Sequence, residues 1–162
     1  MSSPTPAFRQ ARFGAPLLLL AAAAAACGVD EADVASSPAT ETYASLLGVN
    51  IANMTLIQEG LYKQDLIVGT GLEAIKGRDL RVKYTGWLTN GQQFDTNQTT
   101  GIPFTLGRSA VITGWDLGLV GIRPGGKRKL VIGSDLAYGS SGNGSIGPNK
   151  TLVFDITCVS VT

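Results

Sequence analysis

Hydrophobic and polar positions alternate along several stretches of the chain after residue 60, which is the pattern of half-buried β-strands. The alternation is most regular over residues 79–88, where Leu80, Val82 and Tyr84 share one face and charged or hydroxyl residues lie between them. Other β-rich runs are shorter or end at glycine. Strands are therefore predicted at residues 61–68, 79–88, 127–132 and 151–161.

The second of these runs is followed at once by Asn90-Gly91, which predicts a hairpin because both residues accept positive φ. A core helix is indicated over residues 113–120, but Gly114 and Gly118 weaken it, so it needs a sheet to pack on. The four runs and the hairpin partner give about five antiparallel strands. Together they predict an α+β fold with the helix against one face of the sheet.

The first 26 residues have the pattern of a secretory signal peptide. Arg9 and Arg12 precede a ten-residue apolar block, residues 17–26, which ends directly before Cys27. Ten apolar residues are too few to span a bilayer, which takes about 20. We therefore expect residues 1–26 to be a signal peptide and the rest of the chain to be exported.

The alanines before Cys27 indicate that this cysteine is modified by a lipid. Residues 24–27 resemble a bacterial lipobox, in which the cysteine thiol is linked to diacylglycerol. Two acyl chains anchor a protein stably, so the expected location is the cell envelope, in the periplasm or at the cell surface. The alternative is a cut after one of the alanines, which leaves a secreted soluble protein and an incidental Cys27.

The segment between the cysteine and the predicted sheet has two parts. Residues 28–42 are mostly small and polar and predict a flexible tether. Residues 43–59 carry Leu46, Leu47 and Val49 and fit either a short helix or a packed extension. The predicted organisation is a signal peptide at 1–26, a lipidated N-terminus, tether and extension at 27–59, and one domain at 60–162.

Composition narrows the chemistry available to this domain. Thirteen Lys and Arg stand against twelve Asp and Glu, so no strong basic field favours nucleic acid. The chain has no histidine, which excludes Ser-His and Cys-His catalysis and most zinc sites. We expect neither a cofactor nor a metal. Cys158, on the apolar face of the last strand, is predicted to be an inert core thiol.

Two polar segments have structural interpretations. Residues 127–129 are Lys-Arg-Lys and predict a solvated strand edge rather than a nucleic-acid patch. The glycine-rich residues 139–151 lack the spacing of a phosphate-binding loop and precede a strand rather than a helix. They predict a flap or turn.

The local strings of the domain resemble the FKBP family of peptidyl-prolyl cis-trans isomerases. The strings follow one another in the order of that family and cover most of residues 60–160. They are VKYTGWL at 82–88, GQQFD at 91–95, PFTLG at 103–107, VITGWDLG at 111–118, GKRKL at 126–130, LAYG at 136–139 and TLVFD at 151–155. The resemblance implies an antiparallel sheet curled around one short helix.

The same resemblance implies a binding pocket whose floor is Trp115. Asp95, Tyr138 and the backbone N–H of Ile112 would be its polar, catalytic groups, and Ile146 in the flap would reach over the proline. The implied walls are Tyr84, Phe94, Phe104, Val111, Ile112 and Phe154. The implied partners are Pro-containing polypeptides and macrolide inhibitors of the FK506 type.

These residues support two hypotheses about the function. The first is a prolyl isomerase, or rotamase, that acts on exported proteins without covalent chemistry. The second is a non-catalytic module of the same fold that holds Pro-containing peptides. The intact aromatic and polar pocket set favours the enzyme.

Overall fold

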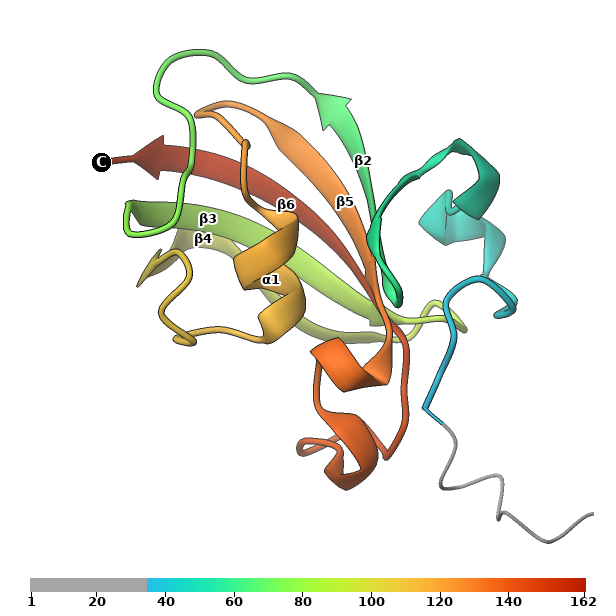
Figure 1. The fold of residues 1–162 in the computed structure, drawn as a ribbon. Helices are drawn as coiled ribbons and strands as arrows, with labels where there is room; N and C mark the ends of the chain where they lie inside the picture. The colour runs from blue at the N-terminus through green and yellow to red at the C-terminus, as the bar shows by residue number, and fades with distance from the viewer. Residues whose placement is uncertain (1–34) are drawn as a thin grey trace, which may run out of the picture.

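The computed structural model describes residues 35–162, which form one antiparallel sheet of six strands in the order β1-β2-β5-β6-β3-β4 (Figure 1). The strands are β1 (Thr55–Gln58), β2 (Leu61–Ile67), β3 (Asp79–Leu88), β4 (Gln93–Thr105), β5 (Lys127–Ile132) and β6 (Leu152–Val161), and the helix is α1 (Thr113–Gly118). The predicted α+β class is confirmed. The sheet has one strand more than expected, because residues 55–58 pair with β2.

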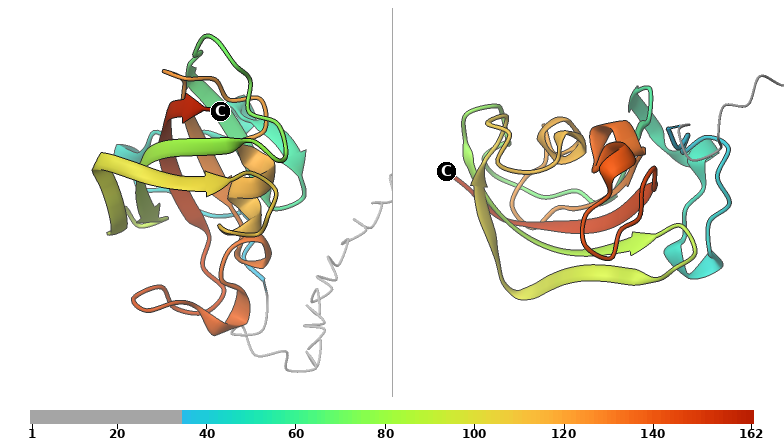
Figure 2. Two further views of the ribbon diagram at one scale, coloured as in Figure 1. Left: turned by 90° about the vertical axis from the view of Figure 1, so that its left-hand side faces the viewer. Right: turned by 90° about the horizontal axis from the view of Figure 1, so that it is seen from below.

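The sheet curves around α1, which lies on its concave face (Figure 2). Two glycines allow this close contact. A Cβ added to Gly114 would lie 2.4 Å from Ile132 Cγ2, and one added to Gly118 would lie 2.8 Å from the Leu130 methyl groups. The residues that weaken the helix locally are therefore the ones that let it pack against β5.

The main core fills the concave side, and the alternation in the sequence sets which residues enter it. Leu80 and Val82 of β3 are 2% and 0% exposed, and Ile156 and Cys158 of β6 are 0% and 1% exposed. Burial raises the pKa of the Cys158 thiol to about 11. The prediction of a buried cysteine in the last strand is confirmed.

The hairpin between β3 and β4 differs in detail from the predicted turn. Gly91 has a φ of 88°, whereas Asn90 is not among the residues with positive φ. The Leu88 N–H donates to the Gln92 carbonyl at 2.9 Å, and the Asn90 side chain accepts from the Gln92 N–H. The asparagine thus stabilises the loop through its side chain rather than through a left-handed backbone.

Residues 43–59 form a packed extension, which settles the alternative that the sequence leaves open. Two 3₁₀ turns, Ser45–Leu47 and Ile51–Asn53, precede β1. Leu47 is 3% exposed and packs against Val131 and Val153 in a second apolar cluster, on the side of the sheet away from α1. The extension therefore covers part of the convex face.

The end of the predicted flexible tether is also packed against the domain. Pro38 is buried, and Ser36 exchanges hydrogen bonds with Ser134. The small polar residues of this segment bury little apolar surface, but their backbone and hydroxyl groups find partners on the domain. Residues 36–38 thus differ from the predicted tether.

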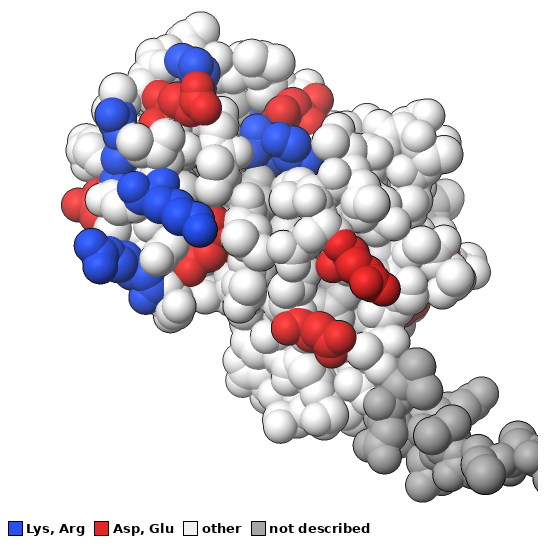
Figure 3. All heavy atoms as spheres, in the orientation of Figure 1, with Lys and Arg blue, Asp and Glu red and all other residues white. Residues whose placement is uncertain are grey.

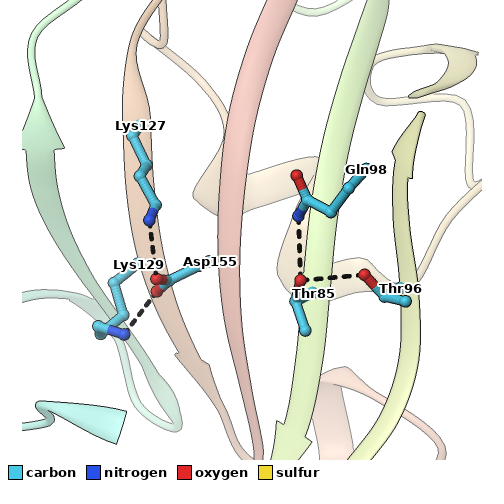
Figure 4. A network of polar contacts seen from close by, with 6 residues as sticks. All are labelled: Thr85, Thr96, Gln98, Lys127, Lys129 and Asp155. Carbon is cyan, nitrogen blue, oxygen red and sulfur yellow. Dashed lines mark hydrogen bonds and ion pairs between the residues drawn. The ribbon is translucent and has the colours of Figure 1, made fainter. Parts of the chain in front are cut away.

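The prediction of a solvated strand edge at residues 127–129 is wrong. Arg128 and Lys129 are 3% and 6% exposed, and β5 lies between β2 and β6 inside the sheet. Lys127 and Lys129 converge on Asp155 of β6 on the convex face (Figure 4). Arg128, on the concave face, pairs with Asp65 of β2 at 2.6 Å. Each buried cation has an acidic partner far away in the sequence, which a local pattern does not reveal.

Charged groups on the side shown in Figure 3 are mixed in sign and scattered between uncharged surface. Within residues 35–162, no helix is long and apolar enough to cross a membrane.

Candidate functional site

A cavity of about 200 Å³ opens between α1, the strands β3, β4 and β6, and the loop that leads into α1. Its lining is mostly aromatic and aliphatic, with one carboxylate and two phenols among the side chains. The lining residues are Tyr84, Phe94, Asp95, Ile102, Ala110, Val111, Ile112, Trp115, Tyr138 and Phe154.

Trp115 is the centre of a cluster of aromatic rings that forms the inner wall. The ring of Tyr84 lies 5.0 Å from that of Trp115 at 80°, and the ring of Phe154 lies 5.2 Å away at 83°. Such edge-to-face pairs add about 0.5–1.5 kcal/mol to the burial of each ring. Trp115 is 3% exposed, and its Nε1 is buried with no hydrogen-bond partner within residues 35–162. The wall is therefore closely packed and largely apolar.

Gly86 of β3 makes room for two of these rings. A Cβ at this position would lie 2.7 Å from Phe154 Cε1 and 2.7 Å from Phe94 Cζ. Those two rings meet edge to face at 5.5 Å. The glycine within VKYTGWL is thus required by the cavity wall, a role that the alternating pattern of β3 does not indicate.

A short hydrogen bond joins two polar groups of the site. Tyr84 Oη donates to Asp95 Oδ2 at 2.5 Å, and Asp95 Oδ1 accepts from the Thr96 N–H at 2.8 Å. Burial, followed by the hydrogen bond and the charge of Asp95, raises the pKa of Tyr84 well above its usual value of 10.0. Tyr84 therefore stays protonated and fixed in orientation across the physiological pH range.

The loop before α1 is held by a buried carboxylate that the sequence does not single out. Asp116 is 8% exposed and accepts from the backbone N–H groups of Gly107 and Ser109 at 2.8 and 2.9 Å. The next residues, Ala110 to Ile112, line the cavity. Ile112 immediately precedes α1, and its carbonyl accepts from the Trp115 N–H at 2.9 Å.

The structure places eight of the ten predicted pocket residues at the cavity, and two of them, Phe104 and Ile146, do not line it. Phe104 is 8% exposed and lies behind Trp115, with ring centroids 6.1 Å apart. Ile146 is 6% exposed and belongs to the main core. Asn143 and Ile146 exchange backbone hydrogen bonds, and this tight turn accompanies the burial of Ile146 instead of its exposure at the cavity.

Ile102 and Ala110 line the cavity although the sequence analysis did not single them out. Ile102 lies in β4 opposite Val82, so its position on the cavity side follows from strand register rather than from a motif. Cys27, the predicted lipidation site, lies outside the described residues. Within residues 35–162, no three His, Cys, Asp or Glu side chains gather in a way that could hold a metal ion.

Comparison with known proteins gives the class of this fold and site. The FKBP-type peptidyl-prolyl cis-trans isomerase model matches residues 71–159. A solved peptidyl-prolyl cis-trans isomerase from Pseudomonas syringae pv. tomato is 34% identical, with a TM-score of 0.61, over 67% of this chain and 80% of that one. AtFKBP13 is 38% identical, with a TM-score of 0.59, over 64% of this chain and 94% of that one.

Relatives found by sequence similarity belong to the same class. The chain is 47% identical over 105 residues to an FK506-binding protein of Neisseria meningitidis serogroup B, covering 63% of this chain and 96% of the relative. It is 46% identical over 110 residues to FK506-binding protein 4 of Dictyostelium discoideum, covering 67% of this chain but only 30% of that longer protein. The chain belongs to the FKBP-type peptidyl-prolyl cis-trans isomerase family, which confirms the resemblance and the enzyme class predicted from the sequence.

Proposed function

We propose that the aromatic cavity binds the prolyl residue of exported polypeptides and accelerates rotation about the X-Pro bond without covalent chemistry. The observation that carries this proposal is the combination of an apolar aromatic wall around Trp115 with a fixed polar pair, Tyr84 and Asp95, at the same cavity. A prolyl ring matches the apolar wall, and the peptide carbonyls on either side of it match the polar groups.

The physical demand of the reaction fits such a site. Rotation about a peptide bond has a barrier of about 18–20 kcal/mol, while the two X-Pro isomers differ by about 1 kcal/mol or less. Only the barrier has to change, so no nucleophile is required. Amide resonance makes the planar ground state more polar than the twisted state, and a water-poor cavity therefore favours the twisted state relative to the planar one.

We assign the polar groups on the basis of their present partners. Both carboxylate oxygens of Asp95 accept hydrogen bonds from the protein, so its role is to orient Tyr84 and to set the local potential. We assign the Ile112 N–H and the Tyr138 hydroxyl as the donors that bind the substrate carbonyls. Phe94 and Phe154 hold the prolyl ring from the sides, and Val111 borders the entrance.

The proposal also covers the location and the ligands. Residues 1–26 and Cys27 suggest export and a diacylglycerol anchor in the cell envelope, with secretion as the alternative. Metabolic palmitate labelling that is present in the wild type and lost in Cys27→Ala is the expected result; an unlabelled wild type would reject the anchor. The relatives named FK506-binding proteins suggest that macrolides of the FK506 type bind in the cavity that we propose for the prolyl residue.

The function is tested by following cis-trans relaxation of a short X-Pro peptide with and without the purified chain. We expect acceleration that an FK506-type macrolide abolishes. A folded chain that binds the peptide but leaves its relaxation rate unchanged would reject the enzyme and favour the non-catalytic binding module.

A further inference from the structure

The N-terminal extension contacts the turn that leads to Tyr138. The Ser36 N–H donates to Ser134 Oγ at 3.1 Å, and the Ser134 N–H donates to Ser36 Oγ at 3.0 Å. A Cβ added to Gly133 would lie 3.0 Å from the Ser36 carbonyl oxygen and 3.2 Å from Pro38 Cδ. Ser134 is 1% exposed, and both hydrogen bonds of this reciprocal pair are partly buried.

This turn is continuous with the cavity wall. Ser134–Leu136 is a 3₁₀ turn, and the Ala137 N–H donates to the Ser134 carbonyl at 2.9 Å. Tyr138 follows directly and lines the cavity. The direction of the Tyr138 side chain therefore depends on a turn whose first residue is held by Ser36.

The same extension contacts the turn that leads to Asp95. The Ala44 N–H donates to the Thr89 carbonyl at 2.8 Å. A Cβ added to Gly91 would lie 3.0 Å from Leu46 Cδ2 and 3.2 Å from Ala44 Cβ, so both side chains contact this turn, and the rest of the Leu46 side chain is exposed. β4 begins two residues later and carries Asp95 to the cavity.

The extension is also fixed by contacts of its own. Tyr43 Oη donates to the Pro38 carbonyl at 2.7 Å. Leu47 is buried against Val131 and Val153 of the sheet. Figure 1 shows the extension on the side of the domain where β3 and β5 end and lead into the two turns. Because the extension has contacts at both ends and in its middle, we expect it to move little relative to the two turns.

We propose that residues 36–47, here called the N-terminal clamp, are a positioning element of the active site: they hold the two turns from which Tyr138 and Asp95 enter the cavity. This inference rests on the proposed function of the cavity. It assigns no substrate contact to the clamp. It attributes the geometry of both polar groups to a segment outside the 71–159 region that the family model matches.

The test uses point variants in the full chain, with amide hydrogen exchange by mass spectrometry and isomerisation kinetics measured on the same samples. Ser36→Ala removes the acceptor of the Ser134 N–H, and Ser36→Thr restores an oxygen at this position. Leu46→Ala removes the leucine contact with Gly91 and leaves the Ala44 contact and the Ala44–Thr89 hydrogen bond in place. Asn50→Ala is the matched control, because its side chain accepts from the Ala52 N–H within the extension but touches neither turn.

We expect Ser36→Ala to speed exchange over residues 133–138 and Leu46→Ala to speed it over residues 89–95. Each change should lower kcat/KM about threefold, the size expected for losing one modest contact. Ser36→Thr should recover the wild-type values, and Asn50→Ala should keep them. Faster local exchange with unchanged kcat/KM would overturn the positioning role, and unchanged exchange at both turns would overturn the clamp.

Failure of the proposed function would be recognised separately. An inactive wild-type chain would reject the isomerase before any variant is compared, and it would remove the positioning role as well. An active wild type with fully active Ser36→Ala and Leu46→Ala would reject the positioning role and leave the isomerase standing.

Discussion

Tyr84 and Asp95 lie on neighbouring strands, and the phenol of the first donates a 2.5 Å hydrogen bond to the carboxylate of the second. The other carboxylate oxygen accepts from the Thr96 N–H, so neither oxygen of Asp95 is left without a partner. The arrangement makes Asp95 a group that orients Tyr84 at the cavity. It also keeps a proton on the phenol, because burial and the nearby charge raise the pKa of Tyr84.

Replacing Tyr84 by Phe tests this relationship. The ring contacts with Trp115 and Phe154 remain, but the donor to Asp95 is lost. A carboxylate that loses a charged hydrogen bond loses about 1.5–3 kcal/mol of stabilisation, part of which water restores here because Asp95 is exposed. We expect kcat/KM for an X-Pro peptide to fall about fivefold. Unchanged kinetics in Tyr84→Phe would show that the hydrogen bond plays no part in the reaction.

Gly86→Ala should damage the cavity wall from behind. The added methyl would overlap Phe94 and Phe154, whose rings lie 2.7 Å from its position. Overpacking of this kind costs about 1–3 kcal/mol. Urea unfolding should show that loss together with a lower kcat/KM. Gly147→Ala is the control, since its nearest neighbour would be Lys150 Cε at 3.7 Å, and it should unfold like the wild type.

Arg128 supports α1 from β5, so its removal should destabilise the fold. It pairs with Asp65 and donates to the Gly118 and Val120 carbonyls at 2.8 Å each. With Arg128→Ala the buried Gly118 carbonyl and the partly buried Val120 carbonyl lose their partner, and we expect the free energy of unfolding to fall by about 2–4 kcal/mol.

Arg123→Ala is a control for the Arg128 variant. Its side chain pairs with Glu73, but the two side chains are 42% and 47% exposed. Exposed ion pairs contribute about 0–1 kcal/mol, so the free energy of unfolding should change little. An equal loss in both variants would contradict the special role of Arg128.

The buried thiol makes stability depend on alkaline pH. Burial raises the pKa of Cys158 from 9.0 to about 11, so the folded chain holds the proton more tightly than the unfolded chain. This contribution is complete below pH 9 and is lost as the pH rises toward 11, to a total of about 2 kcal/mol. Unfolding free energies measured between pH 8 and 11 should show the decline, and Cys158→Ala should show a smaller one. Equal slopes in the two proteins would contradict it.

The sequence predicts those parts of the fold in which burial follows the backbone period. β3 begins and ends at the predicted residues, because Leu80, Val82 and Tyr84 face one core while polar residues face away. The buried cations of β5 break this rule. Arg128 and Lys129 enter the interior only because Asp65 and Asp155 meet them from other strands, and such partners are set by topology rather than by local pattern.

The site, too, has a part that the sequence predicts and a part that it does not. Motif positions placed eight residues at the cavity, whereas Phe104 and Ile146 are buried in the core and do not line it. Whether an apolar side chain faces the cavity or the core depends on local backbone turns that residue type does not determine. The docking of Ser36 likewise depends on a hydrogen-bond pair with a residue 98 positions away, and polar contacts of this kind leave no hydrophobic period.

The most direct test of the proposed function is the cis-trans relaxation rate of an X-Pro peptide measured with the wild type, Asp95→Ala and Gln98→Ala. Gln98 is the control, because it also lies in β4 but its amide donates to Thr85 on the convex face (Figure 4). We predict strong acceleration by the wild type and by Gln98→Ala, and a loss of about tenfold in Asp95→Ala. Full activity in Asp95→Ala, or no acceleration by a folded wild type, would contradict the proposed active site.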